Sequence, residues 1–397
     1  MPLRLLTAGE SHGALVSAIL EGVPAGLSLE PGDINPDLAR RQGLIGGGKP
    51  HPGASPRMKI ERDEAHILGG VMGGVTLGAP IALQIHNLDH SKWKGKAVAP
   101  MTVPRPGHAD LTGAVKYGYD DLRRSLERAS ARETAARVAA GAVCRKLLVE
   151  FGVQVGGYVT EIGGVTAEVS GMSLDERVAG ALQSEMACPT AEGTAAMRAR
   201  VQEIMAGKDT LGGVFEIVAR GVPPGLGSHV HWDRRLTGRL AGALLSIHAM
   251  KGVEIGEAFA NARLAGTQVH DEIVRDDKGN LTRRTNRAGG LEGGITTGQP
   301  LVMRVAMKPI STTLTPLQSV DLASGASSPT DYERSDFCAV PRAVVVGEAM
   351  VCLVLADALL EKLGGDSMGE MRPRFEALRQ ARLEDLVMKG EEQVFWP

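Results

Sequence analysis

The segment RRSLERASARETAARVAAGAVCRKLL, residues 123–148, indicates how the centre of the protein is built. Ser130 and Glu133 have the spacing of a capping box, in which the two side chains satisfy free backbone N–H groups at a helix start. From residue 131 to residue 143 the chain is mostly Ala and Val, so neighbouring elements can approach the helix from several sides. We therefore expect a loop, a cap at Ser130, and then a buried helix whose N-terminus points into the protein.

Arg128 and Arg132 flank this expected helix start. The unpaired N–H groups and the positive end of the helix dipole attract anions, and guanidinium groups reinforce that attraction. We therefore expect an anion to bind there. Taken one at a time, however, arginines are more typical of a solvated surface, where Glu127 and Glu133 would pair with them. Both interpretations stay open when only this segment is considered.

The composition argues against several classes of function. The formal net charge is −2, so the overall charge favours neither nucleic acids nor anionic membranes. Aromatic residues make up 3% of the chain, which argues against the binding of single strands by base stacking. The four cysteines show neither a CxxC motif nor metal-ligand spacing, so we expect no metal site and buried thiols in a reducing compartment.

The N-terminal sequence does not resemble an export signal. Glu10 and His12 interrupt the apolar run that a signal peptide requires. Glu348 interrupts the best apolar stretch, and a transmembrane helix needs at least about 18 apolar residues, so we expect none. These observations predict a soluble, cytoplasmic protein.

Three motifs of the first half recur in the same order in the second half. The pairs are GVPAGL (22–27) with GVPPGL (221–226), GGVTLGAP (73–80) with GGITTGQP (293–300), and ERAS (127–130) with ERSD (333–336). Ordered matches about half a chain apart predict an internal duplication. We expect an α+β fold in which duplicated halves, approximately 1–200 and 201–365, form a β-α-β sandwich with two central helices between two mainly antiparallel sheets. Residues 366–397 would form a peripheral tail.

His12, His108 and Asp336 are the candidate acid–base residues. Both histidines lie in loops bordered by glycine, and imidazole titrates near neutral pH, so either could act as a general acid or base. A single loop histidine is more often solvated or structural. Asp336 is either a carboxylate base or simply the partner of Arg334.

Several arginines lie in expected loops or at helix starts and could line one pocket. They are Arg57, Arg105, Arg128, Arg132 and Arg334. Such a pocket would suit a small substrate with several negative charges, because guanidinium groups bind carboxylates and phosphates through paired hydrogen bonds. The segment KPISTT (308–313) adds a cation and hydroxyl groups suited to phosphate, although it lacks the P-loop pattern. No GxGxxG follows an expected strand, so a Rossmann site has no support.

Taken together, the longer motifs resemble those of the chorismate synthase family over nearly the whole chain. They are GESHG (9–13), LERASARETAARVAAG (126–141), RSDFCAVP (334–341), PRPGHAD (104–110) and, more weakly, RRTN (283–286). The resemblance implies a homotetrameric lyase of the shikimate pathway and aromatic amino-acid biosynthesis. Such enzymes form chorismate by 1,4-anti elimination of phosphate from 5-enolpyruvylshikimate 3-phosphate with reduced FMN, and NADPH is a candidate reductant.

The resemblance also implies roles for individual residues. His12 would manage protons near the departing phosphate and the flavin, His108 would act at the flavin ring, and Asp336 would assist proton movement at flavin N5. The substrate would contact Ser11, Arg57, Arg105, Arg132 and Arg334. FMN would contact Arg128, Ala129, Ser130, His248 (through its backbone), Ala249, Gly293, Lys308, Pro309, Ile310, Ser311, Thr312 and Arg334, and Arg41 would contact NADPH.

The chain departs from the family pattern in one loop. The family has a short loop with an arginine after the helix that ends near Arg41, whereas this chain has an apparent insertion at residues 46–56 and no arginine near Gly47. Lys49 could substitute for that arginine.

Two alternative functions remain at this stage. One is a non-catalytic protein that binds phosphorylated metabolites, against which the joint presence of His12, His108 and Asp336 argues. The other is an NADPH:flavin oxidoreductase, which steady consumption of NADPH in each turnover would reveal.

Overall fold

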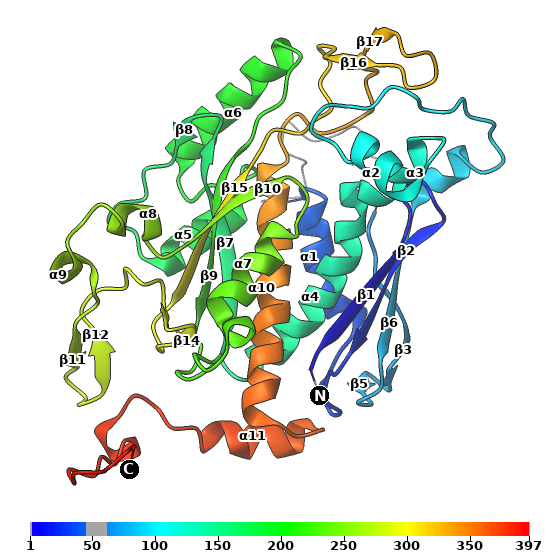
Figure 1. The fold of residues 1–397 in the computed structure, drawn as a ribbon. Coiled ribbons are helices and arrows are strands. Elements are labelled where there is room, and N and C mark those ends of the chain that lie inside the picture. Colours follow the sequence, from blue (N-terminus) through cyan, green and yellow to red (C-terminus); the bar gives the residue numbers. More distant parts are fainter. Residues whose placement is uncertain (1, 45–61, 397) are drawn as a thin grey trace.

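The structure is a computed structural model, and it describes residues 2–44 and 62–396. Its centre consists of two antiparallel sheets and two long helices, an α+β arrangement (Figure 1). The first sheet has the order β1-β2-β6-β3, with β1 Arg4–Gly9, β2 Leu15–Glu21, β3 His66–Gly69 and β6 Ile81–His86. The second has the order β10-β15-β9-β7-β8, with β7 Gln154–Ile162, β8 Val165–Thr166, β9 Gly213–Arg220, β10 Met250–Ile255 and β15 Leu301–Met307.

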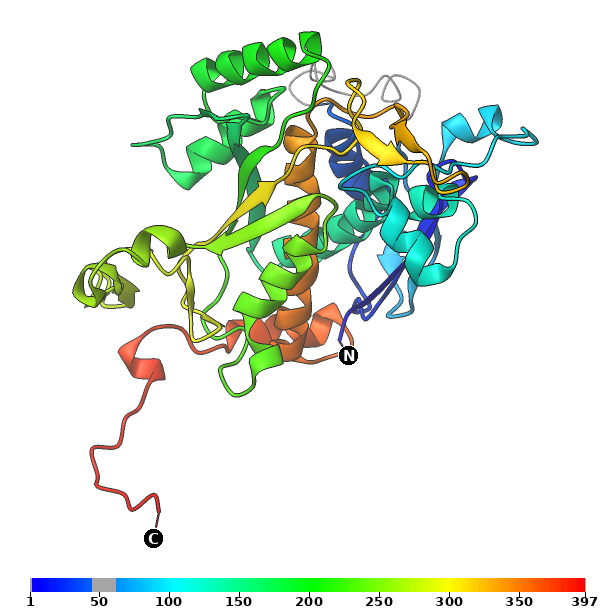
Figure 2. The ribbon, with the colours of Figure 1, turned by 45° about the horizontal axis from the view of Figure 1, so that its top comes forward.

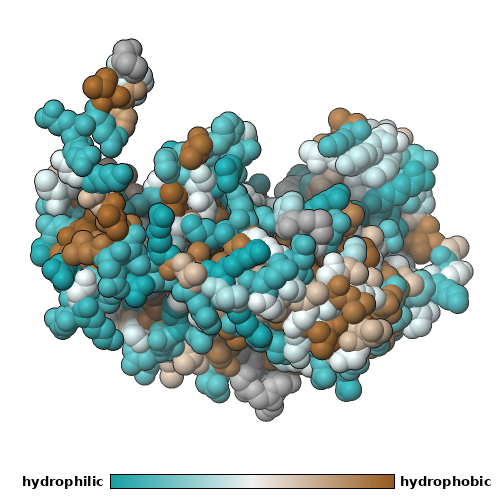
Figure 3. Space-filling model, turned by 90° about the horizontal axis from the view of Figure 1, so that it is seen from below, coloured by the Kyte–Doolittle hydropathy of each residue, from teal (hydrophilic) through white to brown (hydrophobic). Residues whose placement is uncertain are grey.

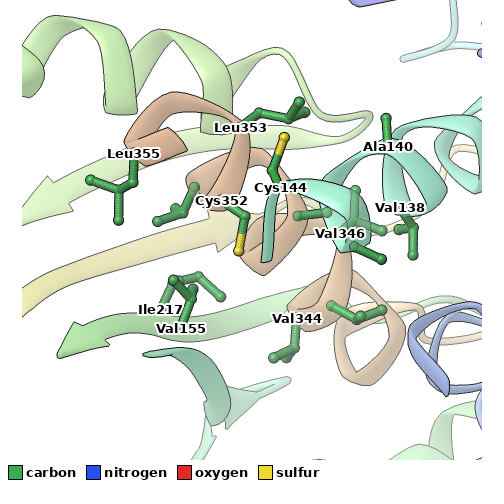
Figure 4. Packing of buried hydrophobic residues seen from close by; sticks show 14 of the residues in the cluster. Val138, Ala140, Cys144, Val155, Ile217, Val344, Val346, Cys352, Leu353 and Leu355 are labelled. Carbon is green, nitrogen blue, oxygen red and sulfur yellow. The ribbon is translucent and has the colours of Figure 1, made fainter. Parts of the chain in front are cut away.

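The two long helices are α4 (Thr134–Val149) and α10 (Val340–Leu363), and they pack against each other. Helix α4 contacts β2 and β6 of the first sheet, whereas α10 contacts β7 and β9 of the second. Figure 4 shows Cys144 of α4 close to Val346 and Cys352 of α10. Because small residues dominate α4, its backbone approaches α10 closely, and a Cβ at Gly141 would lie 2.4 Å from the Cβ of Ala349.

Helix α10 corrects our expectation that the chain has no segment able to span a membrane. By length and composition, Val340–Leu363 passes that test. However, 83% of its most apolar 18-residue window is buried inside the molecule. Glu348 is 1% exposed and accepts hydrogen bonds from Arg40 and Arg145, so the charge that interrupts the apolar run is paired within the core. Helix α10 is therefore a core helix of the fold.

The start of α4 differs from the expected capping box. Residues Arg123–Ala129, expected as a loop, form helix α3, and a 3-10 turn, Ala131–Glu133 (η3), precedes α4. The Ser130 hydroxyl accepts a hydrogen bond from the backbone of Arg132 instead of Glu133. The capping prediction was wrong because the Glu133 carboxylate already accepts hydrogen bonds from Thr7 of β1 and from Arg137.

Smaller elements surround this centre. The other helices are α1 Pro31–Arg41, α2 Asp110–Tyr117, α5 Leu174–Gln183, α6 Ala191–Ala206, α7 Leu236–Leu245, α8 Ala258–Asn261, α9 Gly266–Val269 and α11 Met368–Glu376, with 3-10 turns η2 Leu88–Lys92, η4 Trp232–Arg234 and η5 Leu383–Asp385. The short strand pairs are β4 Val71–Met72 with β5 Val75–Thr76, β11 Ile273–Arg275 with β12 Leu281–Arg283, β13 Leu291–Glu292 with β14 Ile295–Thr296, and β16 Gln318–Val320 with β17 Ser327–Pro329.

Two of these peripheral regions stand out in the figures. The β16–β17 hairpin lies beside the segment before α2, where Ser319 Oγ donates to the carbonyl of Pro104 at 2.6 Å (Figures 1 and 2). At the opposite end, the chain after α11 runs away from the body as a tail (Figure 2). The tail carries exposed apolar side chains, including Phe395 and Trp396 (Figure 3).

We predict that Gly141→Ala destabilises the protein, because the added methyl group would overlap α10 at Ala349. Overpacking of this kind costs about 1–3 kcal/mol, which urea unfolding would measure. The control is Gly242→Ala in α7, where a Cβ meets no atom within 4 Å. There, the better helix propensity of Ala should raise stability by up to about 1 kcal/mol. Equal effects of the two substitutions would contradict the proposed packing.

Candidate functional site

A cavity of about 690 Å³ lies at the N-terminal ends of α4 and α10. Its wall combines segments that are far apart in the sequence: the loops before β2 and α2, the η3 turn, the loop between α7 and β10, and residues 307–312 and 333–336. The first three segments belong to the part of the chain before α4, and the others to the part between α7 and α10. The ERAS and ERSD motifs, recognised in the sequence as a repeat, therefore meet at one cavity.

Cationic side chains outnumber carboxylates in the wall of this cavity. The cations are Arg41, Lys92, Lys96, Arg105, Arg132, Lys308, Arg334 and Arg342, and the carboxylates are Asp89, Glu333 and Asp336. A low-polarity enclosure strengthens the attraction of such groups for an anion. The predicted arginines at positions 105, 132 and 334 are thus brought together. Arg57 lies outside the described residues.

Buried carboxylates behind the wall hold these arginines in place. Asp63, whose side chain is fully buried, accepts from Arg132 Nη1 at 2.5 Å and from Arg41 Nη1 at 2.9 Å. Asp110 accepts from Arg105 Nε at 2.8 Å, while Arg105 Nη1 donates to Thr312 across the cavity at 3.1 Å. Each guanidinium is therefore fixed before any ligand arrives, which is the condition for electrostatic preorganisation.

Arg41 is part of this buried network. It is 4% exposed, and its guanidinium also donates to the Thr134 hydroxyl and to the carbonyl of Ala131. The resemblance implied that it contacts NADPH. In the structure the guanidinium of Arg41 donates to these buried acceptors, and Arg41 is also one of the residues that line the cavity.

His12 and His108 both face the cavity, and each is bound to a carboxylate through Nδ1. The His12 Nδ1 lies 2.7 Å from Glu127 Oε1, and its backbone N–H donates to Glu127 Oε2 at 2.8 Å. The His108 Nδ1 lies 2.6 Å from Asp110 Oδ1. The ring of Trp93 packs on that of His12 with 4.3 Å between the centroids.

Both carboxylates are held in their ionised form. Burial raises the pKa of the Glu127 carboxyl, but hydrogen bonds from the side chain and backbone of His12 outweigh burial, so the pKa lies below its ordinary value. Burial likewise raises the pKa of Asp110, and hydrogen bonds from His108 and Arg105 lower it further than burial raises it. Both groups are therefore hydrogen-bond acceptors at neutral pH.

Asp336 lies in the wall and pairs with Arg342, not with Arg334 as one alternative from the sequence had it. Arg342 also donates through Nε to the carbonyl of Arg41 at 2.6 Å, and Arg334 pairs with Asp89 at 2.9 Å. Nearby, Ser130 Oγ donates to Ser11 Oγ at 3.1 Å, so these two predicted residues also meet at the cavity.

Most of the predicted cofactor residues line the cavity as well. They are Ala129, Ser130, His248, Ala249, Lys308, Ile310, Ser311, Thr312 and Arg334. Burial lowers the pKa of His248 below its ordinary value, so its imidazole is neutral near pH 7. Its Nδ1 is buried and has no hydrogen-bond partner among the described residues.

Among the predicted residues that the structure describes, three are not in the wall. Arg128 turns towards β1, where it donates to the carbonyls of Thr7 and Gly9. Gly293 lies in the turn between β13 and β14, far from the N-terminal ends of the central helices (Figure 1). Pro309 does not line the cavity, although Lys308 and Ile310 on either side of it do.

Sequence reasoning missed several residues of the wall, chiefly Trp93, its neighbouring lysines at positions 92 and 96, and Arg342. The long aperiodic stretch 86–110 was a usable signal, because loops of that length in a compact domain are usually functional. An aromatic residue between lysines in a chain with three tryptophans was another. Arg342 gave no signal, since it stands at the start of an apolar helix.

A family model described as chorismate synthase matches residues 3–360. The chain belongs to the chorismate synthase family. The chorismate synthase of Desulforudis audaxviator is 53% identical over 379 residues, which cover 93% of this chain and 95% of that protein. That of Aquifex aeolicus is 52% identical over 391 residues, covering 94% and 96%. A solved structure described as a chorismate synthase superposes with a TM-score of 0.77 at 45% identity and covers 95% of this chain and 97% of its own.

Membership of the chorismate synthase family assigns the chemistry. The chain is a lyase of aromatic amino-acid biosynthesis that forms chorismate by 1,4-anti elimination of phosphate from 5-enolpyruvylshikimate 3-phosphate. The family uses reduced FMN. Neither the metabolite-binding protein nor the NADPH:flavin oxidoreductase is supported by these relationships.

We predict that Asp63→Asn weakens both stability and substrate binding. The amide would leave the buried guanidinium groups of Arg41 and Arg132 without their shared carboxylate, and breaking a buried ion pair costs about 3–5 kcal/mol. Urea unfolding and the substrate KM would measure the two effects. The control is Asp120→Asn, which removes an exposed pair with Arg124 and should cost less than about 1 kcal/mol. Wild-type stability and KM in Asp63→Asn would contradict this role.

Proposed function

We propose that the cavity binds 5-enolpyruvylshikimate 3-phosphate and reduced FMN side by side. The observation that carries this proposal is the convergence of fixed cations from both halves on one space that two histidines also face. The substrate bears two carboxylates and one phosphate, so it needs several guanidinium groups to replace its hydration. A cavity of about 690 Å³ lies within the ordinary range for ligand sites of about 300–1,000 Å³.

The wall of the cavity also fits a flavin. Apolar side chains from β15, the loop after α7, and α10, such as Met307, Ile247 and Val346, suit the ring system. Lys308 and the hydroxyls that follow it suit the phosphate. The unpartnered Nδ1 of His248 is a buried polar atom that a ligand would satisfy. When bound, the reduced flavin supplies the electron density for the elimination and takes up the hydrogen that leaves the substrate.

The residues of the chain would bind and orient the substrate and move protons around it. Arg105, Arg132 and Arg334 would offset the charge of the substrate and of the departing phosphate. His12 would hold a proton at Nε2 and deliver it to a phosphate oxygen, while His108 would act at the flavin ring. Asp336, held by Arg342, would accept a proton near the flavin.

We infer that the two halves arose by duplication and form the β-α-β sandwich. What supports this is that β1-β2-β6-β3 and β7-β9-β15-β10 share one strand order, with α1 and α7 at equivalent places. In addition, Thr76 Oγ1 donates to Pro24 and accepts from Leu27 at 2.7 and 2.9 Å, and Thr296 does the same with Pro223 and Leu226 at the same distances. This correspondence favours a division near residue 150 over the one expected near residue 200.

We further propose, from the family resemblance, that the protein is a cytoplasmic homotetramer and that NADPH can reduce its FMN. Because Arg41 is buried, we do not assign it the nicotinamide contact. Anaerobic mixing of the protein, FMN and NADPH tests the reduction, and oxidation of NADPH without added reductase is expected. No oxidation would mean that the reductant is external.

The experiment that tests the function is an anaerobic assay with chemically reduced FMN that follows phosphate and chorismate. Release of both products in equal amounts, with reductant in catalytic quantity, is the expected result. Stoichiometric consumption of reductant, or no phosphate release, would overturn the proposal for this cavity.

We predict that His12→Ala and His108→Ala each lower kcat by about a hundred- to ten-thousand-fold, the usual contribution of a positioned acid–base group. The same anaerobic assay measures the effect. The control is His231→Ala, which removes an exposed imidazole paired with Asp233 and should leave kcat unchanged. Near wild-type turnover in both cavity variants would remove their proposed roles.

A further inference from the structure

The two histidines of the cavity share an arrangement that the functional assignment does not explain. Each ring nitrogen Nδ1 is bound to a carboxylate of the same segment or of an adjoining helix: Glu127 of α3 for His12, and Asp110 at the start of α2 for His108. The Nε2 atoms make no hydrogen bond to any residue in the described parts of the chain. Both rings thus have one occupied and one unoccupied nitrogen, and both line the same cavity.

The hydrogen bonds around Glu127 determine which nitrogen of His12 carries the proton. One carboxylate oxygen accepts the backbone N–H of His12, and the other faces Nδ1. Since the carboxylate is ionised, it can only accept, so Nδ1 must donate. The lone pair of the neutral imidazole is then on Nε2. The carbonyl of His12, 2.9 Å from His90 Nδ1, and the ring of Trp93 hold the residue in this orientation.

The same reasoning applies to His108, where a third group comes close. Arg105 Nη2 lies 3.0 Å from both His108 Nδ1 and Asp110 Oδ1. A guanidinium N–H cannot accept, so the contact between Nη2 and Nδ1 is not a hydrogen bond if Nδ1 carries a proton. Arg105 Nη2 and His108 Nδ1 lie close together because both donate to the same oxygen, Asp110 Oδ1. His108 Nδ1 is therefore the donor in its contact with Asp110.

We propose that Glu127 and Asp110 are positioning residues that fix His12 and His108 in the Nδ1–H form, so that both present Nε2 to the bound ligands. This inference rests on the proposed function of the cavity. In the elimination, His12 that carries a proton on both ring nitrogens would deliver the Nε2 proton to a phosphate oxygen and return to the neutral Nδ1–H form. The Nδ1 proton stays on His12, hydrogen-bonded to Glu127. The carboxylates act on rate through the histidines and do not touch the substrate.

Glu127→Gln makes a sharp test because of the geometry. The backbone N–H of His12 can only donate, so the single amide oxygen must take that place, and the amide NH₂ then faces Nδ1. Nδ1 is thereby forced to accept, and the proton moves to Nε2. The substitution should invert the tautomer of His12 without a change in side-chain size.

The measurement is ¹⁵N NMR of the full-length protein with labelled histidine at alkaline pH, where Nδ1–H and Nε2–H tautomers have different nitrogen shifts. The signals of His12 and His108 are assigned from their loss in His12→Gln and His108→Gln. We expect both residues as Nδ1–H in the wild type, and His12 as Nε2–H in Glu127→Gln. Either residue found as Nε2–H in the wild type would overturn the proposal for its pair, and this holds even if a variant fails to fold.

The kinetic counterpart is a fall in kcat of about a hundred-fold in Glu127→Gln with little change in substrate KM, since an interaction that acts in the transition state is lost. Glu203→Gln, an exposed position on α6, is the matched control and should equal the wild type. Wild-type kcat and an unchanged tautomer in Glu127→Gln would refute the positioning role. An inactive wild-type protein would instead refute the proposed function, so the two failures are distinguishable.

Discussion

The close contact between α4 and α10 sets the geometry on which the rest of the molecule depends. At Gly141 of α4 the two helix backbones are so close that even a methyl group would overlap Ala349 of α10. Helix α4 also packs on the first sheet and α10 on the second, so this contact connects the two sheets. The N-terminal ends of both helices then open on one cavity, and loops that are about 200 residues apart in the sequence become its walls.

Gathering so many cations in one cavity requires buried anions behind them. Asp63 forms ion pairs with two arginines. Asp110 pairs with Arg105 and also accepts a hydrogen bond from His108. Removing charges from water is costly unless they are paired and fully hydrogen-bonded. The carboxylates offset this cost and at the same time fix the direction of each donor. The pairing that permits burial therefore also provides the preorganisation that a phosphate-leaving reaction needs.

The sequence predicted the parts of this arrangement that depend on local pattern. The two central helices, the strands that border the repeated turns and the loops carrying His12 and His108 follow from periodicity and glycine placement. The details that depend on distant partners were not predictable. Glu133 did not form the capping box because Thr7 reaches it from β1, and Arg128 turns away from the cavity to the same strand. Gly293 belongs to the repeated motif GGITTGQP, but it lies in the turn between β13 and β14, away from the cavity.

Arg342 and Asp63, which the sequence did not indicate as part of the site, both support other side chains. Arg342 connects Asp336 to the carbonyl of Arg41, and Arg41 in turn shares Asp63 with Arg132. This chain of contacts links α10, α1 and the η3 turn into one rigid wall. A motif search finds groups that meet the ligand, whereas groups of this second kind have no fixed spacing, because any element that reaches the site can supply them. Since a ligand-facing group keeps its direction only while its support is intact, the precision of the cavity depends as much on these supporting residues as on the signature motifs.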